Sequence, residues 1–394
     1  MPWRQVDPMT ERHRFLADAR HRVASFTELC RHYGVSRTTG YKWLHRANQS
    51  GLDYLQELSR RPRTCPHATS PELVAKLVEA RRHHPDWGPR KLLKLLRRQD
   101  RHQPWPARST VAALLRRHGL VLPRRRRTYP GHPGRPLTPM SAPNVIWTAD
   151  YKGEFKTGDG RYCYPLTLQD GFSRYLLSCR GLTGTTTAEC WPVFTRLFQE
   201  YGLPEILRTD NGVPFATGAL GRLSQLSVWW IRLGISPELI EPGQPQQNGR
   251  HERMHRTLKR ATARPPAPTR RSQQQRFEAF RLEYNTVRPH EALNDETPAS
   301  LYTRSPRPYP TTLAPLEYPG HYEVRLVSAN GGIRWQHHWV NVSHVLAGEY
   351  VGFEEIDSAE WDLYFGALKL GRFHERLLRV EDALGRLARK RVKV

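Results

Sequence analysis

Three acidic residues in the middle of the chain lie at positions where their carboxylates could be exposed to bind a metal ion. Asp150 ends the run "NVIWTAD", Asp210 ends "EILRTD" just before a turn-forming Asn-Gly pair, and Glu252 lies in "QNGRHERMHRTLK". Carboxylate oxygens are the ligands that Mg²⁺ prefers, and a two-ion phosphodiester site needs one carboxylate that bridges ions roughly 3.5–4 Å apart. The three residues therefore predict a site for two Mg²⁺ or Mn²⁺ ions, provided that the fold brings them together.

The elements that would position these carboxylates follow from the hydrophobic periodicity after residue 140. The predicted elements are strands in 144–155, in 161–169 and after an Asp170-Gly171 turn, a helix over 186–201, a strand in 205–210, a helix over 217–234, a strand in 236–240 and a helix over 245–262. Three strands followed by strand-helix alternation predict one mixed sheet covered by helices. Asp150 then lies on the first strand and Asp210 at the C-terminal tip of the fourth.

The helix over 245–262 decides how the third carboxylate is displayed. Helical spacing puts Met254, Leu258 and Ala261 on the face that meets the sheet. The opposite face carries the following residues: Glu252, His255, Arg256 and Lys259. We therefore expect Glu252 in a cleft lined with cations that can hold DNA phosphates.

Each acidic residue also has a simpler structural interpretation, and Glu252 is part of a second motif that indicates another class of enzyme. Asp210 could serve only its turn, Glu252 could be a surface residue paired with Arg256, and Asp150 a strand-end acid. The segment "HERMH" also matches the His-Glu-x-x-His pattern of zinc metallopeptidases through His251 and His255. A peptidase would leave the basic N-terminal third and the Asp210 turn unexplained, so we regard it as the weaker interpretation.

Charge and composition indicate a polyanionic partner. The 394 residues carry a formal net charge of +25. Residues 1–140 hold 29 Lys/Arg against 10 Asp/Glu, whereas the remaining residues hold 33 against 27. Nucleic acid is favoured over a membrane, because no apolar run approaches spanning length. The five cysteines form neither a disulfide framework nor a zinc-ligand spacing, and the lack of an apolar signal segment predicts a cytoplasmic protein, nucleoid-associated in a bacterium.

The first basic segment has the residue pattern of a helix-turn-helix motif. In "SFTELCRHYGVSRTTGYKWLHRA", Gly34 can supply a left-handed turn and Ser36 can cap the following helix. The residues expected to pack that helix are Val35, Tyr41 and Leu44. The residues expected near base edges at its start are Arg37, Thr38, Thr39 and Lys42. An ordinary helical hairpin with a solvated basic face is the plainer alternative.

A second helix-turn-helix unit and a basic linker are predicted after it. Ser70 with Pro71 can begin one helix, Ser109 can cap another, and Gly119 can end it. The contacting turn would hold Arg108, Ser109 and Thr110, although a dimerisation helix would show the same pattern. The linker "PRRRRTYPGHPGRPLTP" should track phosphates without reading sequence, through Arg124, Arg125, Arg126 and Arg127.

The C-terminal part has a different pattern. Proline-rich "RSPRPYPTTLAP" precedes about five short strands with Gly and Asn turns, which predict a small all-β barrel. Its charge is nearly balanced, so it could contact protein as well as DNA.

Four motifs in the same order carry a resemblance to a known family. They are "WTADYKGEF", "RTDNGVPF", "QNGRHERMHRTLK" and "EYNTVRPHEALNDETPASLY". With the paired helix-turn-helix units ahead of them, they make the chain resemble bacterial insertion-sequence transposases of the Asp-Asp-Glu type, which have a retroviral-integrase-like core. The resemblance spans about residues 26–302, and it implies that Asp150, Asp210 and Glu252 form the acidic triad and that Lys259 contacts transposon-end DNA. One departure is the 41 residues between Asp210 and Glu252, which we attribute to an extended helix over 218–234.

Together these patterns predict a multidomain protein. N-terminal all-α helix-turn-helix units precede a central α/β RNase H-like mixed sheet with helices and a C-terminal all-β barrel. The predicted boundaries are 1–60, 61–122, a linker 123–140, a catalytic core 141–302, a linker 303–318, a barrel 319–384 and a basic tail 385–394. The implied activity is metal-dependent cleavage at the ends of a mobile element and transfer of the 3′-OH ends into target DNA. Double-stranded DNA and further copies of the chain, at least one, are the expected partners, and a non-catalytic DNA-binding regulator is the alternative.

Overall fold

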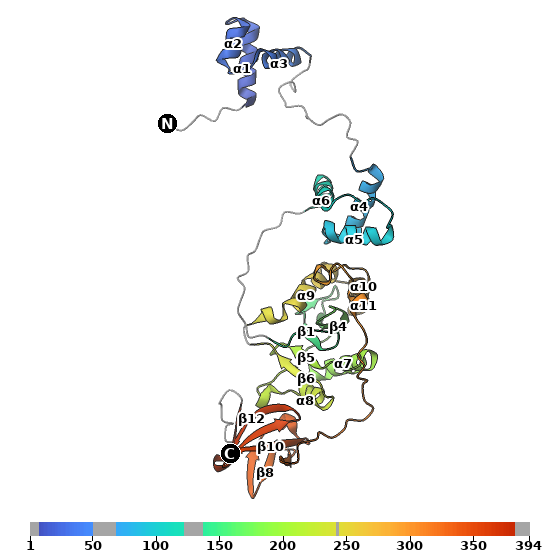
Figure 1. Ribbon diagram of the computed structural model, residues 1–394, viewed down its shortest axis with the longest axis vertical. Coiled ribbons are helices and arrows are strands. Elements are labelled where there is room, and N and C mark those ends of the chain that lie inside the picture. Colours follow the sequence, from blue (N-terminus) through green and yellow to red (C-terminus); the bar gives the residue numbers. More distant parts are fainter. Residues whose placement is uncertain (1–7, 50–67, 122–136, 242–243, 383–394) are drawn as a thin grey trace. The chain divides into compact units, whose positions relative to one another are not determined.

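The computed structural model describes residues 8–49, 68–121, 137–241 and 244–382. The chain divides into two compact units, Met1–Ser70 and Pro71–Val394, which are described separately (Figure 1). In the described part of the chain, no helix has both the length and the apolar character needed to span a membrane. The predicted basic tail and most of the linker before the core lie outside the described residues.

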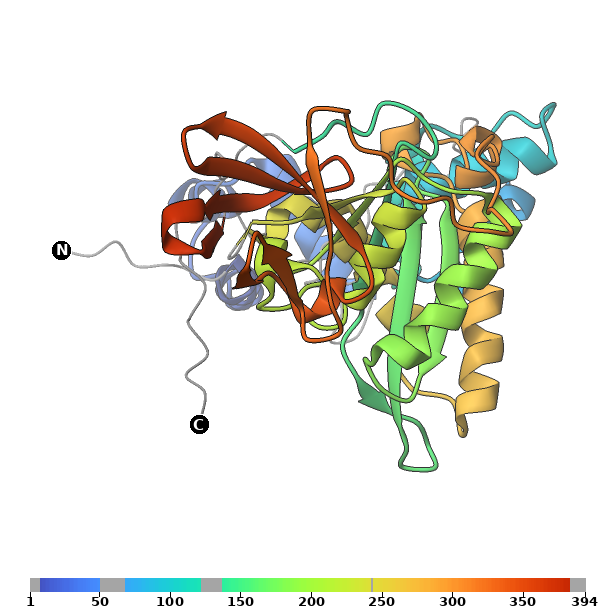
Figure 2. The same cartoon turned by 90° about the horizontal axis from the view of Figure 1, so that it is seen from below.

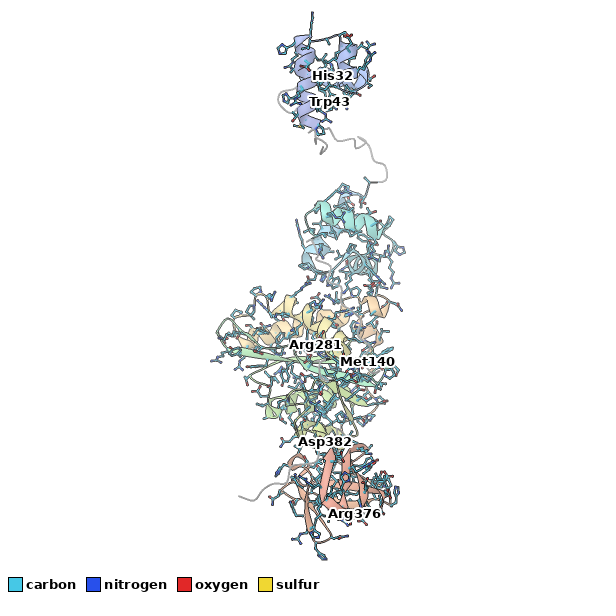
Figure 3. The ribbon with its side chains drawn as sticks, turned by 90° about the vertical axis from the view of Figure 1, so that its left-hand side faces the viewer. His32, Trp43, Met140, Arg281, Arg376 and Asp382 are labelled. Atoms are coloured by element: carbon cyan, nitrogen blue, oxygen red, sulfur yellow. The ribbon has the colours of Figure 1, made fainter. Side chains whose placement is uncertain are left out.

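The first unit is a three-helix bundle with its own small core. Its helices are α1 (Pro8–His21), α2 (Phe26–His32) and α3 (Arg37–Gln49). A capping box between Ser25 and Glu28 begins α2, and Gly34 makes the left-handed turn at φ +64°. The bundle closes over buried Phe15, Leu29 and Trp43, the last of which is labelled in Figure 3. The first predicted helix-turn-helix motif is therefore present, and it consists of α2, the turn at Gly34 and α3.

One residue of this unit was predicted on the wrong face. Tyr41 was expected to pack α3, but its side chain is 50% exposed and its ring lies 4.3 Å from that of Phe26. The buried stripe of α3 runs through Gly40, Trp43 and Ala47 instead. Gly40 is needed there because a Cβ at this position would lie 2.8 Å from the Cys30 sulfur. Tyr41 is one step round the helix from that stripe and therefore faces outward.

A second group of three helices opens the larger unit. It comprises α4 (Pro71–His83), α5 (Pro89–Gln99) and α6 (Arg108–Arg117), and Gly119 follows α6 at φ +68° as predicted. The prediction that Ser109 caps α6 is wrong. Ala107 is the N-cap residue, and Ser109 lies inside the first helical turn. Since alanine has no side-chain acceptor, no side-chain cap bond closes this end.

Helix α5 turns its basic face to acidic residues of the core rather than to solvent. Arg90 contacts Asp295 at 2.6 Å and Glu291 at 2.8 Å, and both Lys94 and Arg98 contact Glu296. Each pair is partly exposed and contributes little alone, but together they fix the position of α5. The first turn of α6 carries exposed Arg108 and Ser109.

The core contains the predicted mixed sheet. Its strands are β1 (Ile146–Tyr151), β2 (Phe155–Lys156), β3 (Tyr162–Asp170), β4 (Leu176–Leu182), β5 (Ile206–Thr209) and β6 (Ser236–Leu239). The order is β2-β3-β1-β5-β6, and β4 also pairs with β3. Pairing is antiparallel between β1, β3 and β4 and parallel between β1, β5 and β6. The parallel part brings the carboxyl ends of β1 and β5 to the same edge.

Two pairs of helices cover the two faces of this sheet. Helices α7 (Thr187–Tyr201) and α8 (Gln225–Arg232) bury one face, and α9 (Gly249–Thr262) and α10 (Arg270–Thr286) bury the other. Helices α7 and α10 can be followed beside the strands in Figure 2. Because side chains alternate along a strand, Trp147 and Ala149 of β1 face α7. Thr148 and Asp150 therefore face α9.

The segment between β5 and α9 differs from the prediction. Residues 217–234 were expected to form one long helix, but the structure has a short 3₁₀ turn (η2, Leu220–Arg222) and then the eight-residue α8. Gly221 at φ +64° interrupts any continuous helix there. Ser224 begins α8 by accepting the Ser227 backbone N–H. A loop with the short η2 turn therefore replaces the first part of the predicted helix between Asp210 and Glu252.

Phe194 offers a direct test of the packing between α7 and the sheet. Its side chain is fully buried, with its ring 5.1 Å from that of Trp230. We expect Phe194→Ala to lower the free energy of unfolding of the core by about 3–5 kcal/mol, because it leaves a cavity. Urea unfolding followed by tryptophan fluorescence measures the change. Arg196→Ala, on the exposed side of the same helix, should shift stability by less than about 0.5 kcal/mol, and equal effects would contradict this packing.

The C-terminal part is an antiparallel β-unit that packs on α8. Its strands are β7 (Glu323–Leu326), β8 (Gly332–Trp335), β9 (His338–Asn341), β10 (Tyr350–Asp357), β11 (Glu360–Phe365), β12 (Leu368–His374) and β13 (Arg379–Asp382). They form a sheet in the order β13-β12-β11-β10-β7 and a separate β8-β9 pair. Val228 and Ile231 of α8 share its hydrophobic core. These pairings give all-β structure, while closure into a barrel stays a prediction, as do the predicted domain boundaries.

Candidate active site

A cleft of about 460 Å³ lies at the edge of the sheet where β1 ends and α9 passes. Two of the three predicted carboxylates, Asp150 and Glu252, line it together. Its lining residues are Asp150, Tyr151, Lys152, Glu252, His255, Arg256, Lys259, Arg260 and Arg264. Two acids and five Lys or Arg side chains thus share one opening, as expected of a site that handles a polyanion.

Asp210 stands next to this cleft without lining it. Ala149 of β1 pairs in parallel register with Thr209 of β5, so the residues that follow them, Asp150 and Asp210, leave neighbouring strands at the same edge. The Asp210 Oδ1 accepts the Gly212 backbone N–H at 3.1 Å, which is the local turn that the Asp-Asn-Gly sequence predicted. The same carboxylate is close enough to act on Asp150 electrostatically, as the pKa of Asp150 shows.

Asp150 has the perturbed titration expected of an acid in a carboxylate cluster. Burial, followed by the charges of Asp210 and Glu252, raises the pKa of Asp150 to about 7, against the opposing influence of Lys152. Nearby like charges make the ionised form costly unless a cation joins them. Asp210 and Glu252 therefore both act on Asp150, although the three acids come from a strand, a loop and a helix.

Five cations line the cleft with the acids, and the sequence predicted two of them. Arg256 and Lys259 are exposed and line the cleft as expected from their face of α9. Lys152 was missed, although it follows Asp150 by two residues and therefore shares its side of the strand end. Burial and the charge of Lys259 lower the pKa of Lys152. The acidic and basic groups are close enough to influence each other's ionisation.

The buried face of α9 differs from the predicted one. Met254 and Leu258 are buried as expected, whereas Ala261 is exposed and Thr262 is buried in its place. His255 was assigned to the cleft face and is 5% exposed, so it borders the cleft from below instead of projecting into it. His251 is fully buried. Helix α9 is thus turned so that both histidine rings pack against polar residues of the sheet.

Ring nitrogens of both histidines lie within hydrogen-bond distance of threonine hydroxyls of the sheet. His251 Nδ1 lies 2.7 Å from Thr148 Oγ1, and His251 Nε2 lies 2.6 Å from Thr167 Oγ1. His255 Nε2 contacts the same Thr167 oxygen at 2.6 Å. Burial lowers the pKa of His251 to about 3, and burial together with His251 lowers the pKa of His255.

These contacts count against the zinc interpretation of the His-Glu-x-x-His pattern. A zinc ligand needs a free nitrogen directed at a shared metal position, and both nitrogens of His251 are already engaged. Within the described residues, no group of three or more His, Cys, Asp or Glu side chains is arranged to hold a metal ion, and this applies to Asp150, Asp210 and Glu252 as well as to the two histidines. The donor chemistry at the cleft, oxygen-rich and acidic, suits Mg²⁺ or Mn²⁺ better than Zn²⁺.

The predicted DNA-contacting residues fall into three groups in the structure. Five of those on α3 and α6 are exposed: Arg37 and Thr38 in the first turn of α3, Lys42 in its second turn, and Arg108 and Ser109 in the first turn of α6. Thr39 and Thr110 are half-buried, and Thr39 donates its backbone N–H to Ser36 Oγ at 3.2 Å, so it helps to cap α3. Arg124, Arg125, Arg126 and Arg127 lie outside the described residues. Tyr41, which was expected in the core, joins the exposed face of α3.

Comparison with protein families agrees with this architecture. Two models described as integrase core domain match residues 140–245 and 233–298, which together span the sheet, the cleft and α10. Two models described as homeodomain-like domain match residues 9–56 and 39–115. The chain therefore has the domain content of a transposase or integrase, with helix-turn-helix DNA-binding domains ahead of an integrase core.

Relatives of this chain include proteins of bacterial insertion elements. An uncharacterized 31.7 kDa protein of insertion element IS407 from Burkholderia multivorans is 28% identical over 234 residues, which cover 58% of this chain and 80% of that protein. An uncharacterized 39.2 kDa protein of insertion element IS476 from Xanthomonas euvesicatoria is 27% identical over 238 residues, or 60% of this chain and 66% of that protein. Among solved structures, the HTLV-2 integrase catalytic core domain in complex with magnesium aligns with 41% of this chain and 99% of its own, with 17% identity and a TM-score of 0.33. The resemblance to insertion-sequence transposases with an integrase-type core is thus confirmed by the family models and the insertion-element relatives.

Proposed function

We propose that this protein binds the terminal inverted repeats of its own insertion sequence, cleaves the DNA at the element ends and transfers the 3′-OH ends into target DNA. The observation that carries the proposal is the cleft in which Asp150 and Glu252 meet, with Asp210 raising the pKa of Asp150 from the adjacent strand. In this proposal Asp150, Asp210 and Glu252 are the catalytic residues and hold two Mg²⁺ or Mn²⁺ ions. No protein nucleophile is required.

The donor set fits such ions on its own chemistry. Three carboxylates from β1, the loop after β5 and α9 supply hard oxygen ligands, and their mutual repulsion would be relieved by divalent cations. The chemistry that the bound ions supply at a site of this kind is activation of water for attack on a phosphodiester and stabilisation of the leaving 3′-oxygen.

The residues of the chain itself have two further tasks in this proposal. Lys152, Arg256 and Lys259 hold phosphates of the DNA so that the scissile bond reaches the carboxylates. The exposed N-terminal parts of α3 and α6 contact base edges of the element ends, through Arg37, Thr38 and Lys42 on α3 and through Arg108 and Ser109 on α6. Tyr41, exposed beside Lys42, adds an aromatic contact to the first of these surfaces.

Joining two element ends to one target requires more than one active site, so at least a dimer should assemble on the DNA. The alternative is a non-catalytic DNA-binding regulator derived from such an enzyme. A regulator has no need of three interacting carboxylates beside a basic cleft, and their arrangement favours the enzyme.

A strand-joining assay tests this proposal. Full-length protein is mixed with Mg²⁺, a short duplex that ends in the element's terminal repeat with a free 3′-OH, and a supercoiled plasmid. We expect covalent joining of the 3′-OH strand to the plasmid, and no joining when the terminal repeat is scrambled. Sequence-specific binding without any joined product, in the presence of either Mg²⁺ or Mn²⁺, would support the regulator instead.

A further inference from the structure

The contacts beneath Asp150 form a continuous line of four side chains. Thr148 of β1 and Thr167 of β3 lie in the sheet, and His251 and His255 lie on α9 directly against them. The line ends at His255 Nδ1, which is 3.7 Å from the Asp150 Oδ2. All four side chains are at most 5% exposed. Polar groups so deeply buried are costly unless they are fully hydrogen-bonded, so their presence under a predicted catalytic acid calls for a role.

Hydrogen-bond capacity restricts how the protons are arranged along this line. The Thr167 hydroxyl has one hydrogen but three neighbours, the two histidine Nε2 atoms and the Asp150 carbonyl oxygen at 3.0 Å. If the hydrogen goes to the Asp150 carbonyl or to His251 Nε2, His255 must carry its hydrogen on Nε2, and its bare Nδ1 faces the carboxylate. If it goes to His255 Nε2, the hydrogen of His255 is on Nδ1 and faces the carboxylate instead.

The charge of Asp150 selects between these two arrangements. A bare ring nitrogen beside an ionised carboxylate is repulsive, whereas an N–H directed at it is attractive. In the second arrangement the Thr148 hydroxyl donates to His251 Nδ1 at 2.7 Å in preference to the Gln169 carbonyl oxygen at 3.3 Å. His251 Nε2–H then donates to Thr167, and the Thr167 hydroxyl donates to His255 Nε2. Every donor then points toward Asp150, and hydrogen bonds aligned in this way strengthen one another.

We infer that His255 is a positioning residue for Asp150, and that Thr167 and His251 set its tautomer so that Nδ1–H fixes which carboxylate oxygen is presented to the cleft. The separation of 3.7 Å is longer than a direct hydrogen bond, and such contacts at active sites tighten in the assembled complex. His251 and His255 are thereby structural parts of an oxygen-ligand site and not metal ligands themselves. The inference rests on the proposed function, since it assigns Asp150 to a metal site.

Mn²⁺ binding to the DNA-free, full-length protein, measured by electron paramagnetic resonance, tests this inference without relying on activity. An asparagine side chain can place an N–H where His255 Nδ1 lies, and a glutamine side chain reaches the Nε2 position. We expect His255→Ala and His255→Gln to raise the Mn²⁺ dissociation constant about tenfold or more, and His255→Asn by less than about threefold. Thr167→Val keeps the shape of the side chain but breaks the line, and should raise the constant several-fold.

Thr195→Val is the matched control, because it makes the same substitution on α7, away from the cleft, where the Thr195 hydroxyl donates to the Trp191 carbonyl. It should leave Mn²⁺ binding unchanged, and thermal unfolding of each variant verifies that the fold is retained. Wild-type Mn²⁺ affinity in both His255→Ala and Thr167→Val would overturn the inference, as would equal losses in the asparagine and glutamine variants. Mn²⁺ binding that survives Asp150→Asn would instead contradict the proposed metal site, and the inference would fall with it.

Discussion

Replacing any one of Asp150, Asp210 or Glu252 by its amide is expected to lower DNA cleavage and strand joining by about a thousandfold or more. An amide keeps the size of the side chain but removes the charge that would hold a divalent ion. Metal ions contribute several kcal/mol to such reactions, and each 1.36 kcal/mol corresponds to a factor of ten in rate. Affinity for element ends should be retained, because the proposed base contacts lie on α3 and α6 and not in the cleft.

The measurement is single-turnover cleavage of a labelled element end by Asp150→Asn, Asp210→Asn and Glu252→Gln, alongside a gel-shift assay for binding. Glu205→Gln is the matched control, since Glu205 is an exposed acid just before β5, outside the residues that line the cleft. It should cleave at the wild-type rate. Near-normal strand transfer by any of the three site variants would remove that residue from the site.

A fragment of residues 1–140 is expected to retain specific binding to element ends and to lose affinity steeply with salt. It contains both helix-turn-helix groups and 29 Lys/Arg against 10 Asp/Glu. If it neutralises six or more phosphates, affinity should fall at least about a thousandfold between roughly 50 and 200 mM salt. Specificity has a different origin, because base-edge contacts and not phosphate contacts distinguish sequences.

Fluorescence anisotropy with end DNA and with a scrambled duplex of equal length measures both properties. Arg37→Ala in this fragment should cost about 1–3 kcal/mol of affinity for end DNA and narrow its preference over scrambled DNA. Arg14→Ala, on α1 and away from the proposed reading face, should leave the preference unchanged. Equal affinity of the unmodified fragment for the two duplexes would refute the assignment of α3 and α6 as reading helices.

Most strand positions in the core, and α7 and α9 to within a few residues, could be predicted because they follow from local pattern, whereas α8 is shorter than predicted and α10 was missed. The alternation that buries Trp147 and Ala149 also fixes the side of β1 on which Asp150 lies. The Asp-Asn-Gly turn after β5 is a local signal too, and it is sufficient to predict Asp210 at a strand tip. Parallel pairing of β1 with β5 then brings the two acids to one edge.

The errors arose where tertiary contacts override local pattern. Histidine is ambiguous on a helical wheel, and His251 and His255 became buried only because Thr148 and Thr167 of the sheet provide hydroxyl partners. Those partners are 84 to 103 residues away from His251 in sequence, so no local signal predicts them. Similarly, Tyr41 was assigned to a core that Trp43 fills instead, with Gly40 allowing the close approach of α2.

Mapping DNA cleavage by the full-length protein tests the central claim most directly. The protein is incubated with Mg²⁺ and a duplex that carries the junction between its own element and flanking DNA, and the products are resolved to single nucleotides. The account predicts a nick at the element boundary that leaves a 3′-OH on the element strand, lost in Asp210→Asn and supported by Mn²⁺ as well as Mg²⁺. Specific binding of this duplex by the wild-type protein without cleavage, with either ion, would contradict the account. Cleavage by Asp210→Asn at the wild-type rate would contradict it as well.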